Sequence, residues 1–274
     1  MTKLIIDSGA TKTDWCLLAP DGTAQRFATP GMNLSTIGVA ENRAVLEEAL
    51  GRISEVSEIH FYAAGLLGET AQEAIDAVLR TRFPAADIEY ASDLLAAARA
   101  VCGHAPGIAA IIGTGSNTCL YDGHQIVKNV HGGGFIIGDE GSAAALGREF
   151  LADFIKDLVP EDIAADFAAR FESDYAAIVR NVYRSATPSR YLGSIAPFLC
   201  ERAAKPYVKS LIENNFRNFF ERALLQYDRL PVGVVGGFGA ACRPLLEQLG
   251  EGYGITFSRF VKSPMEGLVD YHGL

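Results

Sequence analysis

The stretch LIIDSGATKTDW, residues 4–15, runs from apolar residues into an aspartate and then into small, hydroxyl-bearing residues. Residues 4–6 and 14–19 are apolar runs of strand length, and the Asp21-Gly22 pair after them is typical of a hairpin. The turn between the runs offers backbone N–H groups and threonine hydroxyls, which suit phosphate oxygens. Asp7 would then hold Mg²⁺ through waters. An ordinary hairpin with a solvated aspartate is the alternative for this turn taken alone.

The same order of features returns further along the chain. Residues 108–112 form an apolar run, residues 113–118 read GTGSNT, and a second Asp-Gly pair stands at 122–123. A third glycine turn, residues 236–239, follows the strand expected over 231–235. Recurrence at this spacing indicates duplication of a domain rather than a short-period solenoid. Strands alternate with helical patterns, including a long helical half over 143–227, so the sequence predicts an α/β protein.

Composition narrows the functional classes. The chain has 274 residues, of which 49% are hydrophobic, and its formal net charge is -9. This acidic balance argues against a nucleic-acid partner, because phosphate backbones need a basic face. No apolar run reaches the length of a membrane span and no secretory leader is recognisable, so we expect a cytoplasmic protein without a membrane partner. The five cysteines are dispersed, which predicts free and mostly buried thiols.

Three motifs carry a resemblance to a known superfamily. D-S-G-A-T-K-T-D (7–14), G-T-G-S-N (113–117) and V-G-G-F-G-A (235–240) resemble the phosphate-1, phosphate-2 and adenosine motifs of the sugar kinases, actin and heat-shock chaperones. G-T-G-S-N followed by G-D-E-G-S (138–142) resembles the N-acetylglucosamine kinase branch, which is grouped with the BadF/BadG/BcrA/BcrD ATPases. The resemblance covers nearly the whole chain.

The resemblance implies a two-domain actin-like ATPase fold of the ribonuclease H-like kind, with a duplicated β-sheet core and flanking helices. We expect an N-terminal domain over 1–105, against which 264–274 packs back, and a C-terminal domain over 106–263 with a helical insertion. It also implies that the two domains close on ATP and a sugar. A homodimer is compatible with this expectation.

The resemblance assigns the ligand-binding residues. The ATP phosphates would lie between the first turn and the second, with the adenosine on the third turn, where a missing side chain lets the nucleotide approach the backbone. The ATP-binding residues are Gly9, Ala10, Thr11, Lys12, Thr13, Gly113, Thr114, Gly115, Ser116, Gly236, Gly237 and Gly239. The sugar-binding residues are Asn33, Gly65, Asn117, Gly134 and Asp139. As alternatives, Asn33 is a turn residue and Asp139 caps a helix that begins near Gly141.

Asp93 is the candidate catalytic residue. It follows a strand expected over 88–91 and precedes an alanine-rich helix. In the resembling kinases an aspartate at this position is the general base toward a sugar hydroxyl, and a carboxylate within hydrogen-bond reach of that hydroxyl can take its proton. The alternative is that Asp93 only caps the helix, and the two roles are compatible.

These features together predict an Mg-ATP-dependent amino-sugar kinase with N-acetylglucosamine as leading substrate. A kinase of this branch has a tryptophan where this chain has Gly133, so a roomier pocket that accepts N-acetylmuramate or glucosamine is also considered. One rival is a BadF-type ATPase that activates a partner enzyme through an iron–sulfur cluster, but no cysteine lies between Cys119 and Cys200 to supply that ligand. A non-catalytic nucleotide or sugar sensor is the second rival, and an actin-like filament protein a distant third.

Overall fold

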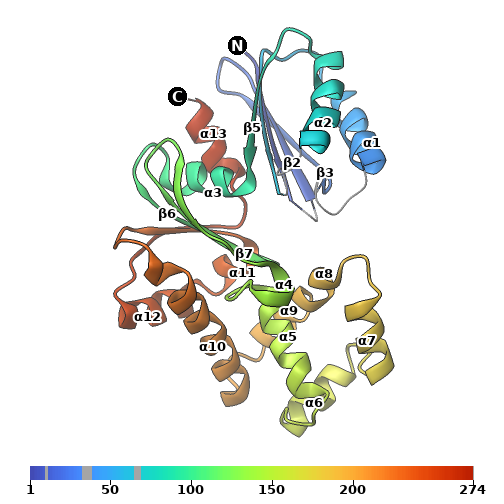
Figure 1. Cartoon of the computed structure of the whole chain (residues 1–274), viewed down its shortest axis with the longest axis vertical. Coiled ribbons are helices and arrows are strands. Elements are labelled where there is room, and N and C mark those ends of the chain that lie inside the picture. Colours follow the sequence, from blue (N-terminus) through green and yellow to red (C-terminus); the bar gives the residue numbers. More distant parts are fainter. Residues whose placement is uncertain (10–11, 33–38, 65–68, 274) are drawn as a thin grey trace. The chain divides into compact units, whose positions relative to one another are not determined.

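The computed structural model describes residues 1–9, 12–32, 39–64 and 69–273. The chain divides into two compact units. Unit 1 consists of Met1–Ala105, Asp122–Ile126 and Ser263–Leu274, and unit 2 consists of Pro106–Tyr121 and Val127–Lys262. Each unit is built on one five-stranded sheet with flanking helices (Figure 1).

The unit 1 sheet has the strand order β3-β2-β1-β4-β5. Its strands are β1 (Lys3–Ser8), β2 (Lys12–Leu18), β3 (Ala24–Pro30), β4 (Glu58–Ala63) and β5 (Asp87–Ser92). The first three strands form an antiparallel meander, and β4 and β5 add in parallel to β1. The turn after β1 places Asp7 opposite Asp14 in the antiparallel register.

Helices cover both faces of this sheet, and the alternation of β1 explains how. Leu4 and Ile6 pack into a core with α1 (Val39–Leu50) and α2 (Glu69–Arg82), whereas Ile5 packs with α3 (Asp93–Cys102) and α13 (Met265–Gly273). Side chains of a strand point alternately to opposite faces, so a continuous apolar run fits a sheet that is covered twice. Trp15 is fully buried and stacks on Phe27.

The unit 2 sheet repeats the topology of the first. Its order is β10-β9-β6-β7-β8, in which β6, β7 and β8 correspond to β1, β2 and β3. The strands are β6 (Gly107–Ile112), β7 (Ser116–Tyr121), β8 (Ile126–Val130), β9 (Val232–Val235) and β10 (Phe257–Val261). β7 is antiparallel to β6, and β9 and β10 are parallel to it. The predicted α/β class with a duplicated sheet core is confirmed.

The long segment between β8 and β9 is helical, as the sequence predicts. It contains α4 (Gly134–Ile137), α5 (Ala143–Phe154), α6 (Glu161–Ala168), α7 (Tyr175–Tyr183), α8 (Pro188–Gly193), α9 (Ala196–Cys200), α10 (Pro206–Arg222) and the 3₁₀ turn η1 (Leu224–Gln226). After β9 come two helices with a break between them, α11 (Gly237–Ala241) and α12 (Arg243–Tyr253). The break is explained by Pro244 in the first turn of α12, because proline has no N–H and is tolerated only where a helix begins.

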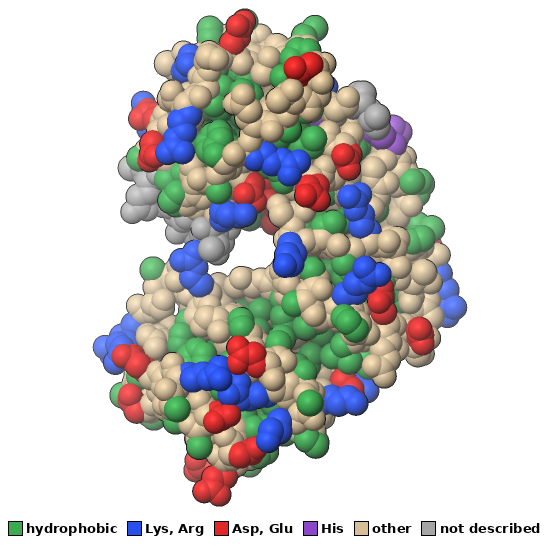
Figure 2. Space-filling view, turned by 180° about the vertical axis from the view of Figure 1, so that it is seen from behind, with side chains coloured by type: hydrophobic (Ala, Val, Ile, Leu, Met, Phe, Trp, Pro, Cys, Tyr) green, Lys and Arg blue, Asp and Glu red, His purple; other side chains and the backbone are tan. Residues whose placement is uncertain are grey.

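The five cysteines match the sequence expectation of free and mostly buried thiols. Basic and acidic side chains are intermixed over the face shown in Figure 2. All five cysteines are free, and Cys16, Cys119 and Cys242 are buried. Within the described ranges, none of the helices combines the length and the apolar character that crossing a membrane requires.

Candidate functional site

The first glycine turn closes the hairpin of β1 and β2. The N–H of Gly9 donates to the carbonyl of Lys12 at 3.0 Å, which makes the connection tight. Thr13 is fully buried, and its hydroxyl lies 2.7 Å from the Ser8 hydroxyl. Ser8 Oγ also accepts from the N–H of Met32 at 3.0 Å. The Thr13 hydroxyl is therefore part of the internal packing of unit 1.

Lys12 lies at the exposed start of β2. Its Nζ is 2.8 Å from Asp14 Oδ2, and the lysine side chain remains 55% exposed. An exposed pair of this kind contributes about 0–1 kcal/mol to stability. Lys12 can therefore exchange Asp14 for another anion at small cost. Ala10 and Thr11, which the sequence also assigns to this turn, lie outside the described residues.

Three carboxylates gather at the end of the unit 1 sheet that follows β1. Asp7 faces Asp14 across the hairpin, and the register from β1 through β4 places Asp7 level with Ala91, two residues before Asp93. Burial raises the pKa of Asp7 to about 7, with the charges of Asp93 and Asp14 adding to the rise and that of Lys12 opposing it. The three carboxylates together can thus carry more negative charge than the single positive charge of Lys12 neutralises.

Asp93 is not the N-cap of α3, so the capping alternative is wrong. The N-cap is Ser92, whose side chain accepts from the N–H of Leu95 at 3.1 Å. Asp93 is the first helical residue, and burial raises the pKa of its carboxyl, with the N–H groups of Asp93 and Leu94 acting in the opposite direction. With the cap supplied by its neighbour, the Asp93 carboxylate is available for another task.

The second glycine turn lies in unit 2 between β6 and β7. The N–H of Gly113 donates to the carbonyl of Gly115 at 3.0 Å. The carbonyls of Gly113 and Thr114 accept from the N–H groups of Ala143 and Ala144, both at 3.0 Å. These donors are the first residues of α5, so the turn is fixed to the N-terminal end of that helix. The Ser116 hydroxyl is likewise used internally, since it donates to the carbonyl of Glu140 at 2.8 Å.

Asp139 lies against this second turn. It is 8% exposed, and a Cβ atom added at Gly115 would lie 2.9 Å from Asp139 Oδ2. Burial raises the pKa of Asp139, although the backbone N–H groups of Ser116 and Gly134 donate to its carboxylate. Its φ of 58° is uncommon for a residue other than glycine, and such conformations are frequent at binding and catalytic sites.

The capping alternative for Asp139 is also wrong. Helix α5 begins at Ala143, and its N-cap is Ser142, whose side chain accepts from the N–H of Ala145 at 3.0 Å. The strained backbone of Asp139 therefore has no explanation in helix capping. It holds a buried carboxylate next to the second turn, where the sequence places a sugar contact.

The third glycine turn follows β9 and packs directly on the second. A Cβ at Gly236 would lie 2.3 Å from the carbonyl oxygen of Ile112, and one at Gly239 would lie 2.7 Å from Val234 Cγ1. These two glycines are needed for the packing of unit 2 itself. Gly237 differs, because a Cβ there would have no neighbour within 4 Å. Gly237 is thus the position of this turn where a ligand could approach the backbone.

The remaining predicted sugar contacts are placed only in part. The Asn117 carboxamide oxygen accepts from Thr118 N at 3.0 Å and from Asn129 Nδ2 at 2.9 Å. Gly134 donates its N–H to Asp139. Gly133 is the N-cap of the short helix α4 and has φ 79°, so a tryptophan at this position would be strained by the backbone alone. Asn33 and Gly65 lie outside the described residues.

Sequence reasoning missed two groups of polar side chains. Asp14 was quoted in the first motif without a role, and only the hairpin register reveals that it faces Asp7. The second group, in unit 1, is His60, Glu89, Arg99 and His272. Three of these offer metal-ligating atoms, but Arg99 binds both Glu89 oxygens, at 2.9 and 2.7 Å. This group is therefore an internal ion-pair network, which joins α13 to the sheet.

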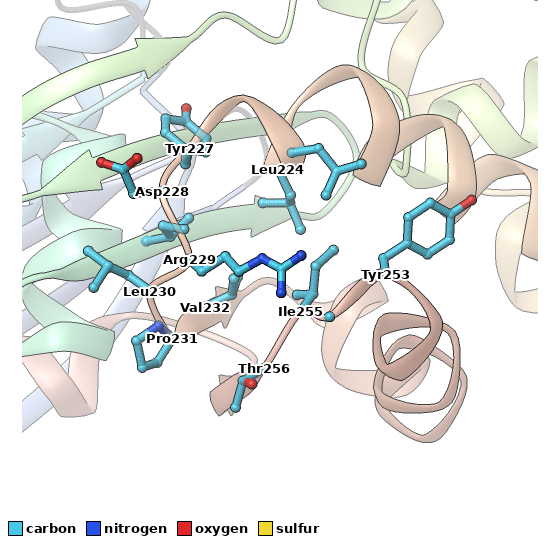
Figure 3. A pocket seen from close by; sticks show the side chains of 13 residues that line it. Leu224, Tyr227, Asp228, Arg229, Leu230, Pro231, Val232, Tyr253, Ile255 and Thr256 are labelled. Carbon is cyan, nitrogen blue, oxygen red and sulfur yellow. The ribbon is translucent and has the colours of Figure 1, made fainter.

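One pocket in unit 2 lies apart from all of these residues. It has a volume of about 250 Å³ and is lined by η1, the start of β9 and the segment between α12 and β10 (Figure 3). The Arg229 side chain extends into it near Leu224 and Ile255. The pocket contacts Val232, the first residue of β9, whereas the third glycine turn follows Val235, the last. It is therefore not the predicted nucleotide site.

Comparisons with known proteins identify the family and the fold of the chain. Residues 6–205 match the BadF/BadG/BcrA/BcrD ATPase family. A solved structure from Porphyromonas gingivalis, that of a proposed N-acetylglucosamine kinase, is 38% identical with a TM-score of 0.92, and the match covers 98% of each chain. No curated protein matches the sequence.

Two more distant structures show the fold. A proposed N-acetylglucosamine kinase from Chromobacterium violaceum is 20% identical with a TM-score of 0.78, over 98% of each chain. A ROK family glucokinase from Streptomyces griseus, solved with glucose and AMPPNP, is 16% identical with a TM-score of 0.58, over 99% of this chain and 98% of its own. The actin-like sugar kinase fold predicted from the sequence is thereby confirmed.

Proposed function

Because the chain belongs to the BadF/BadG/BcrA/BcrD ATPase family, we propose that it is an ATP-dependent kinase that phosphorylates a hydroxyl of an amino sugar. The observation that carries this proposal is the approach of Asp7 to Asp93 at one end of the unit 1 sheet, close enough for one charge to raise the pKa of the other. One carboxylate suits a metal and the other suits a base, which are the two acidic roles of phosphoryl transfer to an alcohol.

The donor chemistry of Asp7 fits Mg²⁺. A partly buried carboxylate whose pKa is raised by burial and by two like charges gains from a divalent cation, which removes the repulsion. Bound Mg²⁺ would neutralise charge on the phosphate oxygens during transfer. Asp7 would hold the metal through water, and Asp14 would add to the field that attracts it.

Asp93 would act as the general base. It accepts the proton of the sugar hydroxyl while that oxygen bonds to the γ-phosphorus, and the bond from this phosphorus to the bridging oxygen of ADP breaks. Burial raises the pKa of Asp93, which makes its carboxylate a stronger base toward the proton of the sugar hydroxyl. Because Ser92 caps the helix, this role does not compete with capping.

The three glycine turns would bind the nucleotide. We propose that the first turn, residues 9–13, and the second, residues 113–116, bind phosphate oxygens through backbone N–H groups other than those of Gly9, Gly113 and Ser116, which donate within the protein. Lys12 would exchange its exposed partner Asp14 for a phosphate. Gly237 would lie under the adenosine, since it is the glycine of the third turn with free space around it.

The proposed acceptor is an amino sugar, with N-acetylglucosamine first. Support comes from the full-length similarity to the Porphyromonas gingivalis protein, at 38% identity. Asp139 would accept hydrogen bonds from sugar hydroxyls, because its carboxylate is held by two backbone N–H groups next to the second turn. N-acetylmuramate and glucosamine remain part of the proposal as further candidate substrates.

An assay of ADP release tests this function. Purified protein with Mg-ATP would be offered N-acetylglucosamine, glucosamine, N-acetylmuramate, N-acetylmannosamine and glucose in parallel. We expect an amino sugar to stimulate ADP release, and a phosphorylated sugar of matching amount to appear by mass spectrometry. Failure of every hexosamine and N-acylated hexosamine to stimulate ADP release would refute the kinase. Sugar binding without turnover would instead favour the non-catalytic sensor.

A further inference from the structure

Two cysteines far apart in the sequence meet in unit 2. Cys200 is the last residue of α9, and Cys242 stands between α11 and α12. Their sulfur atoms lie 4.0 Å apart across 42 residues of chain. Figure 1 shows α9 and α11 in the same region of the unit. A disulfide needs sulfur atoms about 2 Å apart, so a modest approach of the two side chains would allow the bond.

We propose that Cys200 and Cys242 are a modification site at which a reversible disulfide forms and weakens nucleotide binding at the third glycine turn. The second half of this inference rests on the proposed nucleotide site. Neither cysteine lies in the catalytic or binding machinery described above, so the pair would act as a control on it.

The position of Cys242 connects the thiol pair to the third turn. Its N–H donates to the carbonyl of Phe238 at 3.0 Å, and the N–H of Ala240 donates to the carbonyl of Gly236 at 3.0 Å. Helix α11 is only five residues long, so its hydrogen bonds run directly from the turn to Cys242. Pulling the Cys242 sulfur toward α9 therefore displaces the helix that begins at Gly237.

The two thiols differ in exposure and in pKa, and this difference gives each of them a separate role in disulfide formation. Cys200 is partly exposed whereas Cys242 is buried, so an oxidant reaches Cys200 first. The Cys242 thiol can donate to the Cys200 sulfur, which lowers the pKa of Cys200 and raises that of Cys242. The thiolate is the form of cysteine that attacks an oxidant. Cys200 is thus the attacking thiol and Cys242 the resolving one.

A peroxide can serve as the oxidant, and the atoms and electrons of the reaction then balance. The Cys200 thiolate attacks one peroxide oxygen, the O–O bond breaks, and after protonation Cys200 is a sulfenic acid with water as the product. The Cys242 sulfur then attacks the Cys200 sulfur, the S–O bond breaks, and a second water leaves. Two thiols have lost two protons and two electrons to the peroxide. An added dithiol reverses the reaction by thiol–disulfide exchange.

The experiment compares reduced protein with protein treated with hydrogen peroxide, using Cys200→Ser and Cys102→Ser as variants. Cys102 is a matched control, because it is a partly exposed thiol that ends a helix in unit 1. Peptide mapping without reductant should find residues around 200 and 242 linked in the wild type and in Cys102→Ser, but not in Cys200→Ser. The Kd for Mg-ADP should rise at least about fivefold on oxidation, the lower end of typical site-to-site coupling.

A second readout uses the reciprocity of coupling. If oxidation weakens ADP binding by some factor, saturating ADP must shift the dithiol–disulfide equilibrium toward the dithiol by the same factor. Equilibration in glutathione buffers with and without ADP measures this shift. Agreement of the two factors would support the connection through α11 and would not follow from general oxidative damage.

The outcomes separate this inference from the proposed function. Absence of a linked peptide, or an oxidised protein that binds Mg-ADP as tightly as the reduced one, overturns the inference and leaves the kinase intact. If the reduced protein binds no Mg-ADP at all, the proposed nucleotide site fails and the coupling fails with it, while the linked peptide still decides whether the disulfide forms. A Kd change that persists in Cys200→Ser would assign it to another residue and overturn the inference.

Discussion

At the residue scale, Asp93 and Asp7 show how one sheet end can give two carboxylates different environments. Both have a raised pKa, and burial is the largest cause for each. The charges of Asp93 and Asp14 add to the rise at Asp7, so a cation bound at Asp7 would relieve repulsion among the three carboxylates. Asp93 begins a helix that Ser92 caps, which leaves its carboxylate free to act on a substrate.

The variant Asp93→Asn tests the base. The amide keeps the shape and an oxygen acceptor but cannot take a proton, so we expect kcat to fall by about 10²–10⁴ while the sugar Kd changes little. Because Ser92 is the N-cap, the melting temperature should stay close to that of the wild type. Ser92→Ala is the matched control, with a stability loss of about 1 kcal/mol and a smaller effect on kcat. A stable, sugar-binding Asp93→Asn enzyme with kcat within about tenfold of the wild type would end the assignment.

The variant Asp7→Asn tests the electrostatics. The pKa of Asp7 is about 7 in the folded chain against an ordinary value of 3.8, so between these values the folded state binds more protons than the unfolded state. Ionisation of Asp7 therefore lowers stability as pH rises through this window. We expect the free energy of unfolding of Asp7→Asn, relative to wild type, to increase from pH 4 to pH 8 by about 1–3 kcal/mol.

Urea unfolding of both proteins across this pH range, without metal or nucleotide, measures that difference. The comparison cancels other titrating groups, notably His272, whose pKa is lowered to about 3 by burial and nearby cations and which acts in the opposite direction. The same variant should lose kinase activity, since it removes a metal-binding carboxylate. A stability difference that does not vary with pH would contradict the raised pKa.

At the scale of elements, the glycines of the third turn fall into two kinds that the sequence alone does not distinguish. Some are required by packing, and one is not. Gly236 and Gly239 are glycines because Ile112 and Val234 leave no room for a side chain. Gly237 has room, and its φ is not in the left-handed region, so the fold alone does not require glycine there. Substitutions at Gly239 and Gly237 can therefore separate an effect on folding from an effect on nucleotide binding.

The variants Gly239→Ala and Gly237→Ala should have opposite effects. Gly239→Ala crowds the core between β6 and β9, and we expect a loss of about 1–3 kcal/mol in stability. Gly237→Ala should leave stability unchanged or raise it by about 0.5–1 kcal/mol, because alanine favours the helix that begins there. If adenosine lies on Gly237, the added methyl group should still weaken Mg-ADP binding. Thermal unfolding and calorimetric titration distinguish the two, and unchanged ADP affinity in Gly237→Ala would move the adenosine elsewhere.

At the scale of the whole molecule, the duplicated sheets place comparable turns in both units. The first turn follows β1 in unit 1, and the second follows β6, its counterpart in unit 2. The nucleotide contacts proposed above can therefore be tested in each unit by itself. A ligand that binds only one unit would stabilise that unit alone.

Hydrogen exchange measures which units the nucleotide contacts. We expect saturating Mg-ADP to slow amide exchange in peptides that contain residues 9–13, in peptides that contain 113–116, and in peptides that contain 236–239. The pocket around Arg229 serves as an internal control, since we expect no protection there from nucleotide. Protection confined to unit 2 would remove the first turn from the proposed site.

The local pattern of the sequence determined most of the fold. Apolar runs predicted the strands, Asp-Gly pairs predicted hairpins, and the recurrence of strand, turn and strand predicted two sheets of one topology, which the structure has. These features depend on residues close to each other in the chain, where strand periodicity and turn chemistry act directly.

Tertiary structure decided what each polar residue faces. Whether Asp93 or Ser92 capped α3 depended on one residue of register, and the opposition of Asp14 to Asp7 appeared only once β1 and β2 were paired. The reasons for Gly236 and Gly239 lie in β6 and β9, and the approach of Cys200 to Cys242 joins segments 42 residues apart. Burial, charge and close contact depend on neighbours that are distant in sequence, so spacing along the chain cannot specify them.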